Sequence, residues 1–167
     1  MPPQHLISSF ASSELLHQLE STLHHSIPLT RTMGVKVAGC THEGLELCAP
    51  LEPNINHAFT AFGGSLAALT TITSWGMLWL LLDELRDQTQ IIIQDSSLSY
   101  IRPVTRDFKA ICPWPTTEQT ELLQNGINKF GKGRIEMRSD IYENNLPCVG
   151  FQGRFVVLMQ NSAAQAA

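Results

Sequence analysis

Charged residues are scarce in this chain, and neither sign of charge dominates. Asp, Glu, Lys and Arg make up 16% of the 167 residues, and the formal net charge is −4. Proteins that bind nucleic acid generally carry an excess of positive charge, because the phosphate backbone supplies much of their affinity. The composition therefore argues against a general nucleic-acid-binding role. The 43% of hydrophobic residues is enough for one domain with a sizeable core.

Motifs for metal binding and covalent catalysis are also missing. The four cysteines (Cys40, Cys48, Cys112 and Cys148) are widely separated, and no CxxC motif or His/Cys cluster occurs. This spacing argues against structural zinc and favours reduced thiols in a cytoplasmic protein. There is no GxSxG motif, and no cysteine has an obvious histidine partner. We therefore expect neither a metal nor a nucleophilic side chain.

We expect no linker, internal repeat or targeting segment in this sequence. The N-terminus, MPPQHLISSF, has no basic region and no long apolar core, so it does not resemble a signal peptide. The last residues, NSAAQAA, are small and polar, which is typical of a frayed tail. We expect a single domain over residues 1–167, with its core at about residues 10–160.

The most informative segment that is present runs from Asn54 to Asp83. A polar loop with Asn54, Asn56 and His57 leads into Gly63 and Gly64, which open a helix that is apolar on nearly every side. Such a helix lies either in a membrane or at the centre of a core. A glycine pair at its start lets a ligand approach bare N–H groups where the helix dipole is positive. The segment therefore predicts a pocket for an anion or oxyanion beside a long hydrophobic helix.

A membrane span is the competing interpretation of this helix. Residues 65–82 carry no charge and are just long enough to span a bilayer. However, the first half contains several Thr and Ser residues, and no Lys or Arg cluster flanks the segment. We therefore predict a buried central helix and no membrane span.

The remaining segments alternate between helix and strand signals. Ser12 or Ser13 can cap a helix that runs to about His24 and ends before Pro28. The capping-box pattern of Thr116 and Gln119 predicts a second short helix to about Asn128. The central helix is expected at about residues 64–86. Strands are expected at about residues 35–37, 45–49, 91–101, 107–112, 134–141 and 149–159, with a possible bulge at Gly153.

This order predicts an α+β protein in which an antiparallel sheet packs on one long helix. Strands that follow one another without regular crossover helices favour antiparallel pairing. One sheet of this size does not cover a helix that is apolar all round. A second copy of the chain would supply the missing cover, so we expect a homodimer or a higher oligomer.

The order and the motifs resemble the hotdog fold, in which a curved antiparallel sheet wraps around a long central helix. The chain is most similar to the YiiD C-terminal-like family of thioesterases. The resemblance rests on NIN at 54–56, TAFGGS at 60–65, WGMLWLLL at 75–82, the D-x4-YIRPV block at 95–104, GKGRIEM at 131–137 and FQGRFVV at 151–157. Each motif alone is weak, and their order and spacing make the match specific over residues 10–160.

The resemblance implies hydrolysis of an acyl thioester on coenzyme A or an acyl carrier protein. It also implies a dimer, or a dimer of dimers, with sites at the interface. No cofactor is implied other than the coenzyme A that forms part of the substrate. In the family, backbone N–H groups at the start of the central helix hold the thioester carbonyl, and a carboxylate, often with Asn or Ser, directs the attacking water.

Carried onto this sequence, the resemblance assigns the backbone donors to Gly63 and Gly64. Asn56 lies six residues before Phe62, where related enzymes use an Asn to orient water or the carbonyl. Phe62 replaces the histidine of the HGG motif of many relatives. Thr71 stands where those relatives have a carboxylate, and a threonine is not a general base.

Two residues are candidates for the general base. Asp95 shares one face of its predicted strand with Ser97 and Ser99 by the two-residue period. His57 is the alternative, because imidazole side chains in general titrate near neutral pH. Both have a structural interpretation as well: Asp95 as a hydrogen-bonded or exposed strand residue and His57 as a solvated loop residue.

Substrate binding is expected from residues around this helix start and from basic residues nearby. The residues assigned to binding are His57, Thr60, Ser65, Arg102 and Arg106, and the two arginines are candidates for the phosphates of coenzyme A. The acyl tail is expected beside Leu66, Leu69 and Ile72. Acyl length and carrier preference do not follow from the sequence.

Two other functions compete with the hydrolase. The lack of a carboxylate on the helix and the presence of His57 favour a non-catalytic protein of the same fold that binds acyl-CoA. A dehydratase or hydratase would need a histidine with an acidic partner on the opposite subunit. No histidine follows His57, and the hydratase motif is absent, so this last interpretation is disfavoured.

Overall fold

A computed structural model describes residues 12–160, which contain one hydrophobic core. The expectations about the first ten and the last seven residues fall outside this range. The helices are α2 (Ser13–Ser26), α3 (Pro28–Thr32), α4 (Gly63–Leu81) and α5 (Thr117–Phe130), with short 3-10 turns at η1 (Glu52–Asn54) and η2 (Asp83–Gln88). The strands are β1 (Lys36–Cys40), β2 (Leu45–Ala49), β3 (Thr89–Tyr100), β4 (Phe108–Cys112), β5 (Lys132–Glu143) and β6 (Leu146–Met159).

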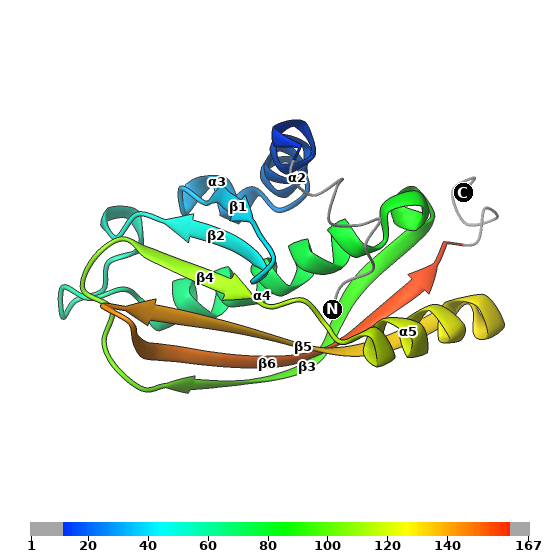
Figure 1. The fold of residues 1–167 in the computed structure, drawn as a ribbon. Coiled ribbons are helices and arrows are strands. Elements are labelled where there is room, and N and C mark those ends of the chain that lie inside the picture. Colours follow the sequence, from blue (N-terminus) through cyan, green and yellow to red (C-terminus); the bar gives the residue numbers. More distant parts are fainter. Residues whose placement is uncertain (1–11, 161–167) are drawn as a thin grey trace.

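The strands form one antiparallel sheet that curves around α4 (Figure 1). Their order is β1-β2-β4-β5-β6-β3, so β1 and β3 are the edge strands. Long ladders join β5 to β6 and β6 to β3, and Asn144 and Asn145 make the tight β5–β6 turn with positive φ. The predicted α+β hotdog architecture is confirmed.

The central helix α4 lies in the core, and its middle is largely apolar and buried. Leu69, Met77 and Leu78 have no exposed surface. The hydroxyls of Thr70 and Thr73 donate to carbonyls four residues earlier, at 3.0 and 2.7 Å. α4 is long and apolar enough to cross a membrane, yet 61% of its most apolar window is buried inside the protein. This degree of burial is typical of a core helix.

The two peripheral helices begin where local capping signals predict. The Ser12 side chain accepts a hydrogen bond from the N–H of Leu15 and caps α2. Thr116 and Gln119 form the complete capping box of α5. Pro28 lies just past the end of α2, as expected, and it also begins a short helix that the sequence did not predict. It occupies the first turn of the short helix α3, where its missing N–H has no helical partner to lose.

Two expectations from the sequence are wrong. The central helix ends at Leu81 rather than near residue 86, and the chain continues as the 3-10 turn η2. Gly153 is not a bulge, because it pairs with Ser96 on β3 and with Met137 on β5, and the register shift of the β3–β6 ladder lies on β3, between Ile93 and Asp95. A Cβ at Gly153 would lie 2.5 Å from the ring of Phe151 and 3.2 Å from that of Phe155. Glycine at this position makes room for two core phenylalanines.

Candidate active site

The start of α4 presents backbone donors that no side chain caps within the part of the chain that the structure describes. Phe62 occupies the capping position in an extended conformation and makes no side-chain cap. The N–H groups of the first helical turn have no intrahelical partner, so those of Gly63, Gly64 and Ser65 are available to a ligand. A Cβ on Gly64 would lie 2.3 Å from the Phe62 ring, so only glycine fits under this ring as it stands.

A groove of about 270 Å³ lies against this helix start. One wall comes from Ala61, Gly63 and Leu66, and the other is the segment from Tyr100 to Val104. The Tyr100 hydroxyl donates to the carbonyl of Gly63 at 3.1 Å. The Tyr100 ring lies 3.5 Å from the position of a Cβ on Gly63. The groove therefore places an aromatic side chain and bare helix backbone next to each other.

The loop before the helix is held by Asn56. Its Oδ1 accepts from the N–H groups of Ala58 and Thr60, at 2.8 and 3.2 Å. Its Nδ2 donates to Thr60 Oγ1 at 3.0 Å and to the carbonyl of Ala61 at 3.4 Å. The Asn56 amide is thus engaged within its own loop, and it shapes the approach to Gly63 instead of pointing a free amide at a ligand.

Asp95 lies on the outer face of the sheet. It pairs with Arg154 on β6, and directly opposed residues share a face. Arg154 alternates with the buried residues Gly153 and Phe155, which face the core. The Asp95 carboxylate is 55% exposed and lies 3.6 Å from the Arg154 guanidinium. Along β3 it is five residues from Tyr100, or about 16 Å. Asp95 and the helix start of the same chain are therefore not brought together.

The remaining polar candidates differ in how they relate to the groove. His57 is exposed on the Asn56 loop, and Ser65 is half-buried in the first turn of α4. Arg102 lines the groove and donates to the carbonyl of Pro147 at 2.8 Å. Arg106 lies 3.4 Å from Glu143 at the β5–β6 turn. Arg102 is thus the basic residue that the fold brings to the helix start.

The predicted acyl-tail residues belong mainly to the core. Leu69 is fully buried and Ile72 nearly so, which leaves no room for a ligand between them. Leu66 is the exception, because it also lines the groove. Of the three predicted residues, Leu66 alone therefore borders the space beside the helix start.

Tyr100 is the groove residue that sequence reasoning did not single out. The signal was the two-residue period of β3, which puts Ser96, Leu98 and Tyr100 on the face opposite Asp95. On this face, Leu98 pairs with the buried Phe151. Alternation alone separates the two faces of a strand but does not say which one faces the core.

Two of the four cysteine thiols, those of Cys40 and Cys112, are poor nucleophiles. All four cysteines are free thiols. Burial raises the pKa of Cys112 to about 12 and that of Cys40 to about 11. Thiols with such values stay protonated at neutral pH, and the thiolate is the reactive form. Within residues 12–160, no group of three His, Cys, Asp or Glu side chains is arranged to hold a metal ion.

Comparison with known proteins identifies the family. The sequence profile of the YiiD C-terminal family, described as "Putative thioesterase", matches residues 16–159. The chain belongs to this family. It is 30% identical to a putative thioesterase from Shewanella oneidensis, with a TM-score of 0.79 over 88% of this chain and 99% of the other.

Other structures extend the likeness of this thioesterase-family protein. A protein of unknown function from Chlorobaculum tepidum is 29% identical, with a TM-score of 0.85 over 92% of this chain and 99% of that one. A thioesterase from Haemophilus influenzae shares the fold at 14% identity, with a TM-score of 0.68 over 90% of this chain and 94% of that one. The membership supports thioester hydrolysis as the general chemistry.

Proposed function

We propose that this protein hydrolyses the thioester bond of acyl-coenzyme A, or of an acylated carrier protein, by direct attack of water. The observation that carries the proposal is the uncapped start of α4, which opens onto the groove of Gly63, Tyr100 and Arg102. The only cofactor-like group in the proposal is the coenzyme A of the substrate itself.

The thioester carbonyl oxygen accepts hydrogen bonds from the N–H groups of Gly63 and Gly64. As water attacks, negative charge develops on this oxygen, and donors fixed in advance stabilise it by about 3–4 kcal/mol. The positive end of the helix dipole adds to this effect. The water oxygen bonds to the carbonyl carbon, the carbon–sulfur bond breaks, and the sulfur leaves as a thiolate that takes up a proton.

We assign the removal of the water proton to His57, with Asp95 as the alternative. His57 lies on the loop that leads directly into α4, and it is exposed to solvent. Asp95 faces away from the helix and is paired with Arg154. Asn56 keeps the loop in shape through its four hydrogen bonds and is a positioning residue.

We assign the phosphate-bearing end of the substrate to the Arg102 side of the groove. Arg102 lines the groove and its side chain is exposed. Arg106 lies farther along the same loop and is 62% exposed, so it remains accessible to a phosphate despite its contact with Glu143. Thr60 and Ser65 supply hydroxyls at the loop and the helix start.

We also propose that the chain forms a two-fold symmetric dimer through β3, which can pair further into a dimer of dimers. Within the described residues, β3 is bonded on one side only, to β6. Its Ile92 and Ile93 are exposed, and a half-buried stripe of Ala68, Thr71 and Trp75 runs along α4. An exposed apolar edge strand is a template for pairing with another chain.

The free thiols are consistent with a cytoplasmic location.

A non-catalytic acyl-CoA-binding protein is the second candidate. It is favoured by one observation: Thr71 on α4 is half-buried at the position where the resemblance leads us to expect a carboxylate. Such a protein would use the same helix start and groove to hold an acyl thioester without turnover.

Steady-state hydrolysis of acyl-CoAs of increasing chain length tests these alternatives. We expect turnover by the wild type and a loss of about 100-fold or more in His57→Gln, the usual contribution of general base catalysis. A comparable loss in Asp95→Asn, with His57→Gln active, would move the base to Asp95. Tight binding of acyl-CoA by the wild type without turnover would favour the second candidate and contradict the hydrolase.

A further inference from the structure

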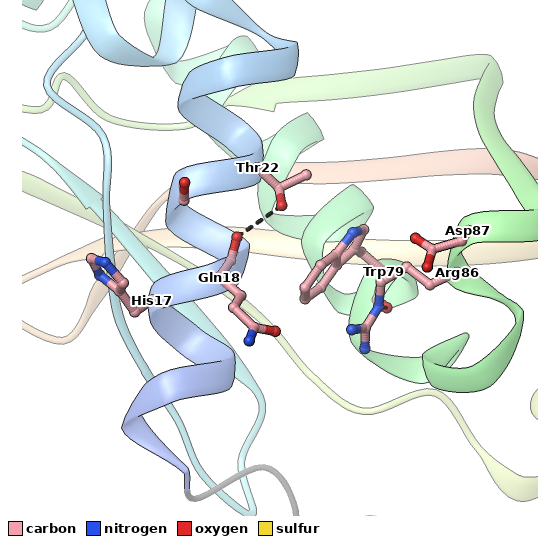
Figure 2. Close-up of a pocket in the computed structure, with 7 residues that line it drawn as sticks. His17, Gln18, Thr22, Trp79, Arg86 and Asp87 are labelled. Atoms are coloured by element: carbon pink, nitrogen blue, oxygen red, sulfur yellow. Dashed lines mark hydrogen bonds between the residues drawn. The ribbon is translucent and has the colours of Figure 1, made fainter.

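A groove at the far end of α4 is left unfilled by the described residues (Figure 2). Two adjoining hollows of about 430 and 530 Å³ share Thr22 of α2, Trp79 of α4, and Arg86 and Asp87 of η2. The larger hollow continues along Trp75 to Ile91 and Ile92 at the start of β3. We call the whole feature the tryptophan groove.

The tryptophan groove has an apolar part around Trp75, Trp79 and Ile91 and a polar part that side chains of α2 and η2 line. The Arg86 guanidinium lies 3.7 Å over the Trp79 ring and donates to the Trp79 carbonyl at 3.2 Å. The stack holds Arg86 against Trp79. The part of the groove beside Trp75 stays open toward the edge strand β3. Such a groove suits a large apolar side chain flanked by polar backbone.

Large apolar side chains without a place in their own chain protrude at the opposite end of α4. Phe59 is 80% exposed and Phe62 is 57% exposed. Phe59 also has a φ of 61°, a left-handed conformation that is rare for an aromatic residue. The Asn56 side chain holds this conformation through its bonds to Ala58 and Thr60. An outlier maintained in this way is a candidate for a function.

Two-fold pairing of β3 brings these two ends together. A strand that pairs with its own copy about a two-fold axis runs antiparallel to it, so Tyr100 of one copy lies near Thr89 of the other when the pairing is centred. Tyr100 is hydrogen-bonded to Gly63, so the helix start and the loop before it lie beside Tyr100. Thr89 lines the tryptophan groove. The exposed Phe59 loop of one copy thus reaches the tryptophan groove of the other.

We propose that the loop of residues 55–62, led by Phe59, docks into the tryptophan groove of a second copy of this chain. The inference rests on the proposed dimer, and it adds that each thioester site is bounded by Trp75 and Trp79 of the partner copy. Two of the three tryptophans therefore report on the docking. Trp114 lies elsewhere, with its indole N–H donating to the carbonyl of Thr41 at 2.8 Å.

The test compares Phe59→Ser with Leu122→Ser, an exposed residue of α5, in the full-length chain carrying Trp114→Phe. Sedimentation equilibrium gives the dimer dissociation constant, and tryptophan emission gives the polarity of the groove. We expect Phe59→Ser to weaken the dimer at least about tenfold, as loss of an aromatic anchor does, and to shift the emission to the red. Leu122→Ser should match the parent protein.

A second variant tests the tryptophan groove, into which the loop docks. Thr22→Trp fills the tryptophan groove from α2, and it should weaken the dimer as Phe59→Ser does. Unchanged dissociation and emission in Phe59→Ser would overturn the proposal, as would a parent protein that is monomeric. An emission shift in Phe10→Ser but not in Phe59→Ser would assign the groove to the N-terminal segment and would also overturn it. Thioester turnover, measured on the same proteins, tests the hydrolase separately.

Discussion

The two ends of α4 differ in what they expose, although they belong to one apolar helix. At its start, Gly63 and Gly64 leave backbone N–H groups bare, and the neighbouring loop is polar. At its end, Trp75 and Trp79 line a groove with large side chains. Most of the middle is packed against the sheet and α2, and the stripe of Ala68, Thr71 and Trp75 is only half-buried. Unsatisfied backbone suits chemistry on a developing charge, whereas aromatic walls suit recognition.

Replacement of Gly64 by valine is expected to have the largest effect, because it closes the start of the helix. The new side chain would collide with the Phe62 ring, which lies 2.3 Å from the Cβ position. We expect kcat/KM for acyl-CoA to fall by about 10³-fold, as when an oxyanion donor is lost. Gly39→Ala is the matched control, because a Cβ at Gly39 meets nothing within 4 Å. Full activity of Gly64→Val would remove the helix start from the mechanism.

Replacement of Trp79 by alanine tests the opposite end of α4. Trp79 is only 7% exposed, and the variant loses its packing and its stack with Arg86. We expect a loss of about 3 kcal/mol in the free energy of unfolding, as for other large-to-small core changes. Urea denaturation at fixed protein concentration measures it, with Leu122→Ala as a control that should change by less than about 0.5 kcal/mol. A loss below about 1 kcal/mol would show that the tryptophan is poorly packed.

Tyr100→Phe refines the account of the helix start. It removes the hydroxyl bond to the Gly63 carbonyl but keeps the ring against Gly63. One neutral hydrogen bond contributes about 1 kcal/mol, so kcat/KM should fall by about fivefold without loss of the fold. Tyr142→Phe, on β5 and also exposed, serves as the control. Equal activity of both variants would leave Tyr100 with a packing role only.

Glu143→Gln is expected to have the smallest effect. Glu143 contacts the loop that carries Arg102. The N–H and hydroxyl of Thr105 donate to the Glu143 carboxylate, and these bonds lower its pKa. A lowered pKa in the folded state contributes stability above the unfolded-state pKa, and this contribution disappears as the pH falls through the folded-state pKa. Glu143→Gln should therefore be less stable than the wild type at pH 7, by less than about 1 kcal/mol, and equal to it in acid.

Thermal unfolding of Glu143→Gln and the wild type between pH 3 and 7 measures this difference, with Glu121→Gln on α5 as the control. A stability difference that persists unchanged in acid would contradict the role assigned to the Thr105–Glu143 contact.

The fold was more predictable from the sequence than the site was. Capping signals at Ser12 and Thr116 and the apolar run of α4 are local, so they identify helices without knowledge of the tertiary structure. The face of a strand is not local. Asp95 and Tyr100 lie on opposite faces of β3, and only pairing with β6 shows that the Tyr100 face meets the core. The same holds for Asn56, whose partners are set by the folded loop.

Backbone NMR of the protein with a non-hydrolysable acyl-CoA analogue, in which a methylene group replaces the thioester sulfur, tests the central claim most directly. The claim is that the N–H groups of Gly63 and Gly64 bind the acyl carbonyl. It predicts that these two amide resonances shift downfield on binding, while those of Gly126 and Gly131, on and just after α5, stay in place. Binding of the analogue with the Gly63 and Gly64 amides unchanged would contradict it.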